Sequence, residues 1–137
     1  MALYDVFRIS GSALSAQSVR LNTVSSNLAN ADSVSDSPEQ AYRARQPVFA
    51  AVMSALDADQ ASVGVRVEGI VESQVEIPRE YMPDHPLADS DGYVYRSNVN
   101  TVEEMANMIS ASRSYQNNIE VLNTSKQLLL KTLNLGR

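Results

Sequence analysis

Residues 105–133, MANMISASRSYQNNIEVLNTSKQLLLKTL, determine the fold of this chain. Apolar side chains recur in this stretch at alternating intervals of three and four residues, and seven of the nine positions in the series are apolar. The series consists of Met105, Met108, Ser112, Tyr115, Ile119, Leu122, Lys126, Leu129 and Leu133. This spacing places all nine side chains along one side of a helix, in a seam of the coiled-coil type. The sequence therefore predicts a long C-terminal helix with one apolar face.

A second series with the same spacing lies at the other end of the chain. Seven of its nine positions are again apolar, and it consists of Leu3, Phe7, Ser10, Leu14, Gln17, Leu21, Val24, Leu28 and Ala31. Two helices at opposite ends of a chain pair only if the chain returns to its start. We therefore predict an α+β fold, in which long N- and C-terminal helices form a coiled coil and enclose a small β-rich middle segment. The predicted segments are 1–33, 34–98 and 99–137.

The remaining surface of the N-terminal helix is polar but almost uncharged. From Ser10 to Ala31 there are eleven Ser, Thr, Asn or Gln residues and a single charged residue, Arg20. Solvated helix faces normally carry Lys and Glu, which have better helix propensity than Ser or Asn. Two interpretations remain open. The helix is either a poor surface helix, or it becomes buried against neighbouring subunits, where neutral hydrogen-bonding groups are tolerated better than charges.

The middle of the chain has the patterns of strands and turns. The turn-forming run Asp32–Pro38 ends the first helix. Strands are predicted at 42–49, 63–67 and 70–77, an irregular extended stretch at Pro78–Pro86, and a hairpin with Asp91–Gly92 in its turn and 93–95 as a strand. Residues 50–61 fit a helical turn or a loop equally well. Asn100 or Thr101 is predicted to cap the second helix, which ends at Leu135 before Gly136.

Composition excludes several classes of protein. The formal net charge of −5 and only two lysines argue against a nucleic-acid partner, which requires a basic surface. The absence of cysteine excludes disulfides and thiol chemistry. No apolar run is as long as a membrane span, and the first ten residues do not resemble a secretory signal peptide. These features predict a cytosolic protein or one exported without the general secretory pathway.

Candidate catalytic and metal-binding residues are few. His85 is the only histidine, and no serine lies in a nucleophile-elbow motif, so an exposed loop histidine is expected. Asp84, Asp89 and Asp91 lie close together, but an EF-hand register with Gly92 as the sixth residue puts Leu87 at the first ligand position and Asn98, instead of glutamate, at the twelfth. Turn formation explains these aspartates better. We predict no enzymatic activity, no cofactor and no metal.

Motifs at both ends resemble those of bacterial flagellar rod and hook proteins. At the N-terminus the resemblance lies in GSALSAQS (11–18), RLN (20–22) and SNLANAD (26–32). At the C-terminus it lies in NVN (98–100), Glu104, Met105, Met108, SRSYQ (112–116), NIEVLN (118–123) and LNLG (133–136). YRA (42–44), PLAD (86–89) and GYV (92–94) add to it in the middle. The match covers most of the chain and, with its length, is most similar to the proximal-rod proteins of this family.

The resemblance implies a non-enzymatic axial subunit of the basal body. Such a subunit is exported unfolded through the flagellar type III apparatus, without a cleaved signal peptide, and assembles in the periplasmic rod. The implied partners are other proximal-rod proteins, the rod-to-ring adaptor, the distal rod and further copies of the chain, with no direct membrane insertion. In this family the terminal helices form the inner coiled-coil layer of a tubular shaft that surrounds the export channel and transmits torque.

The two helical series then become the expected assembly interface. We assign to it Leu3, Phe7, Leu14, Leu21, Val24, Asn27, Leu28, Asn30, Met105, Met108, Tyr115, Ile119, Leu122, Leu129 and Leu133. The alternative class is a cytosolic helical chaperone or adaptor that holds a partner helix on the same faces. A cell-wall hydrolase is a third class, but the sequence offers it no identifiable acid, base or nucleophile.

Overall fold

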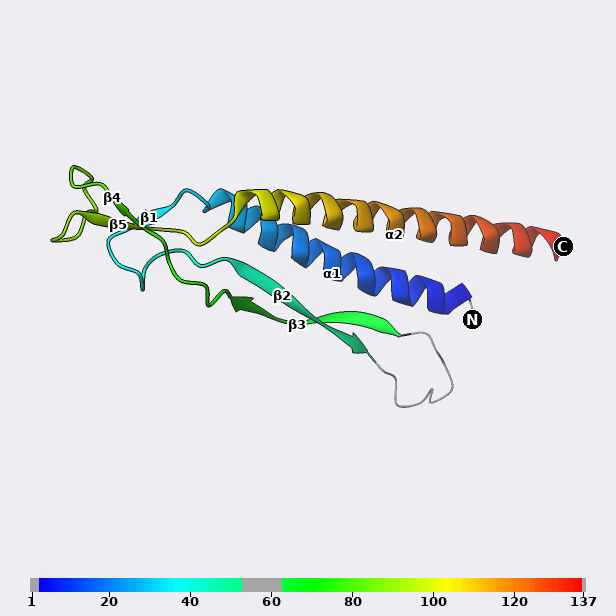
Figure 1. Cartoon of the computed structure of the whole chain (residues 1–137). Helices are drawn as coiled ribbons and strands as arrows, with labels where there is room; N and C mark the ends of the chain where they lie inside the picture. Colours follow the sequence, from blue (N-terminus) through cyan, green and yellow to red (C-terminus); the bar gives the residue numbers. More distant parts are fainter. Residues whose placement is uncertain (1–2, 53–62, 137) are drawn as a thin grey trace. The chain divides into compact units, whose positions relative to one another are not determined.

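Two long helices lie at the ends of the chain, and short strands lie between them (Figure 1). The computed structural model describes residues 3–52 and 63–136. The helices are α1 (Leu3–Ala29) and α2 (Thr101–Leu135), which confirms both predicted terminal helices and the α+β class. The strands of the described residues are β1 (Val34–Ser35), β2 (Arg45–Val52), β3 (Gly64–Glu72), β4 (Arg79–Tyr81) and β5 (Tyr93–Arg96).

Asparagine side chains cap the C-terminal end of α1 and the N-terminal end of α2. Asn100 precedes α2, and its Oδ1 accepts hydrogen bonds from the backbone N–H groups of Val102 (3.1 Å) and Glu103 (3.3 Å). At the end of α1, the Asn30 side-chain amide donates to the Ser26 carbonyl (2.8 Å). The Asn100 bonds satisfy N–H groups that have no intrahelical partner. Asn100 is therefore the residue that caps α2.

Strands β1, β5 and β4 form a three-stranded antiparallel sheet in that order. The turn before β5 contains Gly92, whose φ of +83° favours glycine, and Tyr81 pairs with Tyr93 across the hairpin. The predicted strand at 93–95 is present as β5, but residues 82–92 connect it to its partner, so the hairpin is not the short one expected with a turn at Asp91–Gly92. Its partner strand β4 was not predicted, because the sequence was expected to be irregular from Pro78 to Pro86. Three residues between prolines are too few to produce an alternating pattern.

Strands β2 and β3 form a separate two-stranded sheet and run in opposite directions (Figure 1). Pro47 lies within β2, which is possible because β2 has a hydrogen-bonded neighbour on one side only. The predicted strands at 63–67 and 70–77 merge into β3, which ends at Glu72 and not at residue 77. Of the ambiguous residues 50–61, those up to Val52 continue β2. Residues 53–61 lie outside the described residues.

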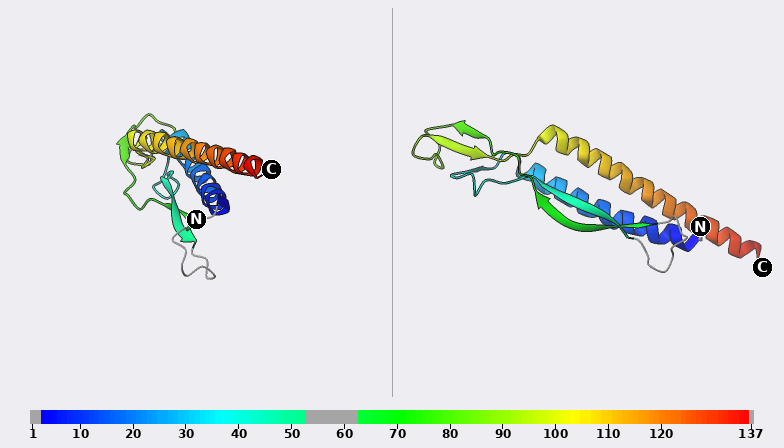
Figure 2. Two further views of the ribbon diagram at one scale, coloured as in Figure 1. Left: turned by 90° about the vertical axis from the view of Figure 1, so that its right-hand side faces the viewer. Right: turned by 60° about the horizontal axis from the view of Figure 1, so that its bottom comes forward.

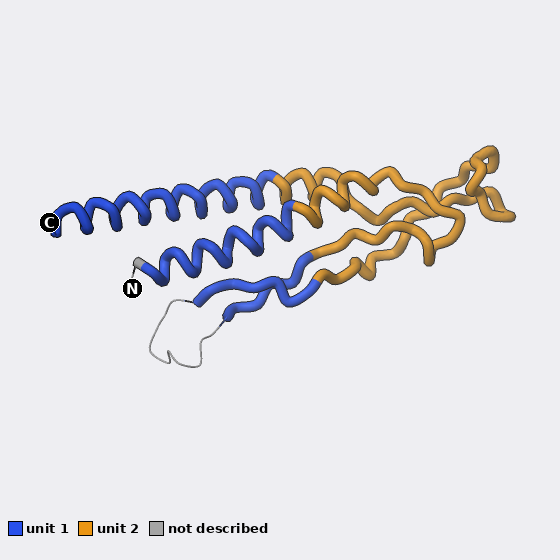
Figure 3. The backbone as a smooth tube through the Cα atoms, turned by 180° about the vertical axis from the view of Figure 1, so that it is seen from behind, with its two compact units in different colours: residues 1–21, 47–69, 109–137 blue, residues 22–46, 70–108 orange. Residues whose placement is uncertain are grey.

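The chain divides into two compact units (Figure 3). Unit 1 comprises 1–21, 47–69 and 109–137, and unit 2 comprises 22–46 and 70–108. In unit 1, β3 is tied to α1 because the Ser12 hydroxyl accepts a hydrogen bond from the Val65 N–H (3.1 Å). Figure 2 shows β3 beside the first part of α1. A coiled coil between the two helices stays a prediction.

The side chains that the structure buries are mostly small. The buried apolar residues are Ala16, Val24, Ala31, Ala41, Ala44, Ile77, Val94 and Ala111. By contrast, many large apolar side chains of α2 are exposed, among them Leu128, Leu130 and Leu133. Large apolar side chains normally form the core of a domain, and their exposure in groups marks an interaction surface. Neither helix is long and apolar enough to cross a membrane within the described residues.

Candidate functional site

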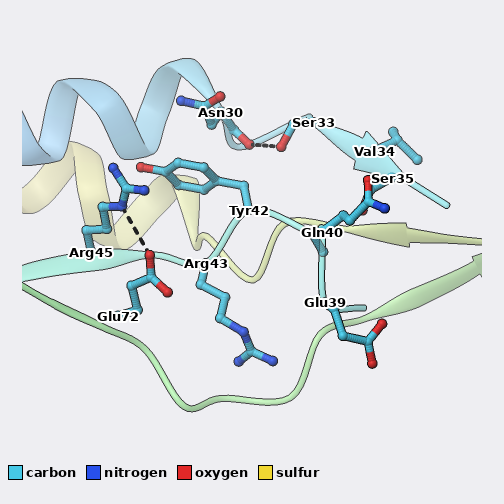
Figure 4. A pocket seen from close by; sticks show the side chains of 11 residues that line it. Asn30, Ser33, Val34, Ser35, Glu39, Gln40, Tyr42, Arg43, Arg45 and Glu72 are labelled. Atoms are coloured by element: carbon cyan, nitrogen blue, oxygen red, sulfur yellow. Dashed lines mark hydrogen bonds and ion pairs between the residues drawn. The ribbon is translucent and has the colours of Figure 1, made fainter. Parts of the chain in front are cut away.

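A polar cavity of about 420 Å³ lies in unit 2 (Figure 4). Three of its four charged side chains, those of Arg43, Arg45 and Glu72, are engaged within the unit. The Arg45 Nε lies 3.5 Å from the Glu72 carboxylate, and the Arg43 guanidinium donates to the carbonyls of Ser73 (3.2 Å) and Val75 (3.3 Å). No serine in the described lining is paired with a histidine or another general base. The cavity therefore offers packing and hydrogen bonding, with no arrangement for nucleophilic catalysis.

The Tyr42 phenol at this cavity has a structural role. Burial raises its pKa above the ordinary value of 10.0, although the Arg45 cation opposes the rise. The hydroxyl is therefore protonated near neutral pH and donates to Oδ1 of Asn27 at 3.0 Å. The phenol is a hydrogen-bond donor to the buried side chain beside it.

Asn27 is the centre of a buried hydrogen-bond network in unit 2, here called the Asn27 node. Its side chain is completely buried, with 0% of its surface exposed. Its Oδ1 accepts from the Tyr42 hydroxyl and from the Arg45 N–H (2.9 Å), and its Nδ2 donates to the Arg45 carbonyl (2.8 Å) and to Oε2 of Glu104 (3.1 Å). All four hydrogen-bonding positions of the amide are used. The node joins the end of α1, the start of β2 and the first turn of α2.

A second asparagine extends this network toward α2. Oδ1 of Asn98 accepts from the Ala44 N–H (2.7 Å), and its Nδ2 donates to the Val75 carbonyl (3.0 Å). The Ser73 N–H donates to the Ala44 carbonyl (2.7 Å). Together these bonds fix the segment before β2 against the chain that enters α2. The predicted interface residue Asn27 therefore has a role within the subunit, and its role between subunits stays a prediction.

The aspartates near Gly92 form a turn. Oδ1 of Asp89 accepts from the N–H groups of Tyr93 (2.8 Å) and Asp91 (2.9 Å), and the Tyr95 hydroxyl donates to Oδ2 (3.2 Å). These donors, that of Tyr93 first, lower the pKa of the Asp89 carboxyl below its ordinary value. Nδ1 of His85 accepts from the Leu87 N–H (3.1 Å). Both side chains thus stabilise the loop that precedes β5, as expected for the aspartate, whereas His85 was expected to be an exposed loop residue and is half-buried.

The predicted interface residues of α1 lie at several depths. Val24 and Asn27 are buried in unit 2, and Asn30 caps the helix end. Half-buried positions are Phe7, Leu14, Leu21 and Leu28. Leu3 begins α1, and its side chain lies outside the described part of the structure. The series therefore faces partly into the subunit, and its role between subunits stays a prediction.

The predicted interface residues of α2 are more exposed. Met105 is 57% exposed and Leu133 is 62% exposed, while Ile119 and Leu129 are each 39% exposed. The less exposed positions of the helix lie partly in the predicted series and partly one residue before it. Met108, Ser112, Tyr115 and Leu122 belong to the series, whereas Glu104, Ala111, Asn118 and Ser125 each precede one of its members, and Asn107 and Ser114 are also half-buried. The apolar seam therefore overlaps the inward face only in part, and Met105, Ile119, Leu129 and Leu133 are exposed.

The outward face of α1 is small and uncharged over most of its length. Its exposed positions after Arg8 are Gly11, Ser15, Ser18, Asn22, Ser25, Ser26 and Ala29. On the inward side, Oε1 of Gln17 is buried without a hydrogen-bond partner among the described residues. A buried acceptor of this kind is costly unless it obtains a donor. The outward face of the helix thus carries small, uncharged side chains, and one buried acceptor on its inward side has no hydrogen-bond partner among the described residues.

The residues that the sequence did not reveal are Glu104, Tyr42 and Asn98. Glu104 was singled out only as part of the resemblance to flagellar rod and hook proteins, yet it is buried against Asn27, 77 positions away. Its place beside Met105, at the edge of the apolar series, was the available signal of burial. Tyr42 and Asn98 also lie in motifs of the resemblance, but their residue types gave no signal of the contacts that they make.

Comparison with known proteins gives consistent matches along the chain. A family model described as flagella basal body rod protein matches residues 7–35, and one described as flagellar basal body rod FlgEFG protein C-terminal matches residues 90–135. The protein named flagellar basal-body rod protein FlgC of Salmonella typhimurium is 55% identical over 139 residues and is covered completely, as is this chain. That of Escherichia coli O157:H7 is 56% identical over 137 residues, with complete coverage of both. That of Buchnera aphidicola subsp. Acyrthosiphon pisum is 42% identical over 140 residues, covering 99% of each.

Proposed function

Since the chain belongs to the FlgC family of flagellar basal-body rod proteins, we propose that it is a structural subunit of the proximal rod. In this role it forms part of the tubular shaft that surrounds the export channel and transmits torque. It assembles with copies of itself, with other proximal-rod proteins, with the rod-to-ring adaptor and with the distal rod. The flagellar type III apparatus exports it to the periplasm without a cleaved signal peptide.

The exposed apolar seam of α2 is the observation that carries this proposal. Met105, Ile119, Leu129 and Leu133 belong to one series of positions at helical spacing and are exposed in the single chain, while Met108, Tyr115 and Leu122 between them are half-buried. A monomeric protein gains nothing from the exposed apolar positions, while a subunit buries them on assembly. They support contact with neighbouring subunits, and the residues assigned to the interface retain that role as part of the proposal.

The α1 helix supports the same conclusion. Its outward face lacks charge from Gly11 to Ala29, so a neighbouring helix approaches it without desolvating an ion. Stiffness of the shaft then arises from many shared contacts and requires no ligand pocket.

Fractionation tests the proposed function. Cells in which this chain replaces their own copy are extracted with detergent, and the basal bodies are purified. We expect the chain in the basal-body fraction and motility in soft agar. Recovery only in the soluble cytosol would favour the alternative of a chaperone or adaptor. A density map of the purified basal body then checks whether the helices lie in the inner layer.

A further inference from the structure

The two units of this protein differ in charge. Unit 1 contains seven basic and five acidic residues, whereas unit 2 contains four basic and eleven acidic residues. The net charge of the whole chain therefore conceals a weakly basic unit and a strongly acidic one. Opposite charge on two parts of one subunit favours contact between unlike parts of different copies, and like parts repel.

In unit 1, both lysines of the chain lie among exposed leucines near the end of α2. We call Lys126, Leu129, Leu130, Lys131 and Leu133 the lysine–leucine surface. All five residues are exposed. Within the described residues neither lysine takes part in an ion pair. This surface combines apolar area with unneutralised positive charge.

In unit 2, the loop between β4 and β5 has the complementary composition. We call Tyr81, Met82, Asp84, Leu87 and Asp91 the aspartate surface. Its apolar members are exposed, Tyr81 by 62%, and so are both aspartates. The ion pairs described in unit 2 use other carboxylates, those of Asp32, Glu72 and Glu80. The surface therefore presents apolar side chains beside uncompensated negative charge.

We propose that the lysine–leucine surface of one copy docks on the aspartate surface of a second copy of this chain. The inference rests on the proposed function, since it specifies one contact of the assembled subunit. The leucines bury apolar area against Tyr81, Met82 and Leu87, while the lysines approach Asp84 and Asp91. Because the two surfaces differ, the contact is heterologous, and the first and last copies of an open series each keep one surface unused. Repeated contacts of this kind extend a series unless the rotation from copy to copy closes it into a ring.

Disulfide cross-linking between two copies that carry a cysteine at different positions tests the contact. The chain has no cysteine, so an introduced one is its only thiol. Cells produce one copy with Leu133→Cys and one with Leu87→Cys, and basal bodies are isolated under mild oxidation. We expect a disulfide-linked dimer that needs both variants, and no such dimer from either variant alone. Cross-linking of Leu133→Cys only to a different rod protein would overturn the assignment of a second copy.

Charge reversal then tests the electrostatic contribution to the docking contact. The variants Lys126→Glu/Lys131→Glu and Asp84→Lys/Asp91→Lys should each reduce the cross-linked yield at least tenfold, since each confronts like charges. Combining the two variants in different copies restores opposite charges at the contact and should restore the yield. A mixture that stays as low as either variant alone would contradict the proposal. Circular dichroism of each purified variant verifies that it folds.

A matched control separates this contact from a general charge effect. Arg66→Glu/Arg113→Glu makes the same charge change on exposed residues of unit 1 away from the lysine–leucine surface. An equal loss of cross-linking by this control would overturn the assignment. If the chain enters basal bodies but the two cysteine variants never cross-link, this contact is wrong and the rod function stands. If the chain is absent from basal bodies, the proposed function itself fails.

Discussion

At the scale of single residues, Asn27 determines how unit 2 is held together. We expect Asn27→Ala to reduce the free energy of unfolding by about 2–4 kcal/mol, because four hydrogen-bonding groups lose the completely buried amide that they share. Urea denaturation followed by circular dichroism measures the change. Asn22→Ala is the matched control, since Asn22 is exposed on the same helix and its removal should change stability by no more than about 0.5 kcal/mol. Equal losses from both variants would show that the node is unimportant.

The Asp89 carboxyl makes the stability of the chain depend on pH. Its pKa is lowered in the folded state, mainly by the Tyr93 N–H, so its contribution is present above the ordinary pKa of 3.8 and is lost as pH falls below it. Asp89→Asn removes the ionised acceptor of the Tyr95 hydroxyl. We expect the melting temperature of the unmodified chain to exceed that of the variant at pH 7. Thermal melts from pH 7 to pH 3 should show the difference narrowing below pH 4, and a constant difference would refute this role.

At the scale of elements, the β4–β5 hairpin depends on Gly92. An added Cβ would lie 2.9 Å from the Tyr81 ring, and the residue has a positive φ. Gly92→Ala should therefore destabilise the chain by about 1–3 kcal/mol, measured by urea denaturation. Gly69→Ala is the control, because a Cβ there meets nothing within 4 Å and φ is not in the positive range. A loss at Gly69 as large as that at Gly92 would contradict the steric explanation.

The apolar seam of α2 should affect assembly more than folding. Leu129→Ser/Leu133→Ser changes two exposed side chains, so we expect the free energy of unfolding to fall by less than about 1 kcal/mol. Incorporation into basal bodies, measured by immunoblotting, should fall at least tenfold. Val102→Ser alters an exposed apolar residue of the same helix outside the seam and should leave incorporation unchanged. Normal incorporation of the double variant would remove Leu129 and Leu133 from the interface.

The sequence predicted the bounds of the two helices well and the inward face of α2 poorly. Long periodic stretches with end signals, such as the cap at Asn100, gave both helices within about two residues. The inward face of α2 was harder to predict than the bounds of the helix, because the apolar seam of a subunit does not have to point inward. Glu104 faces the interior one position before Met105, and its partner Asn27 is 77 residues away. Pairings over such a distance arise from the whole fold, which no local pattern encodes.

At the scale of the whole molecule, the small buried residues imply a weakly held monomer. The apolar core is mainly alanine and valine, and burial of a small side chain contributes less than that of a leucine. We therefore expect backbone amides of α1 before residue 21 and of α2 after residue 109 to exchange rapidly with solvent in a dilute chain. In assembled rods the same amides should be protected. Strong protection of both helices in the dilute monomer, measured by mass spectrometry, would contradict this expectation.

The Asn27 node also imposes an order in time. A ribosome releases a chain from its N-terminus, so Asn27 emerges long before Glu104. Glu104 is the last in sequence of the three residues that share the four hydrogen bonds of the node. The three hydrogen bonds to Tyr42 and Arg45 need only the first 45 residues, whereas the bond to Glu104 joins residues 77 positions apart, and closing such a loop is entropically costly. Completion of unit 2 therefore waits for roughly three quarters of the chain. A chain that lacks residue 104 leaves Nδ2 of Asn27 with one acceptor in place of two.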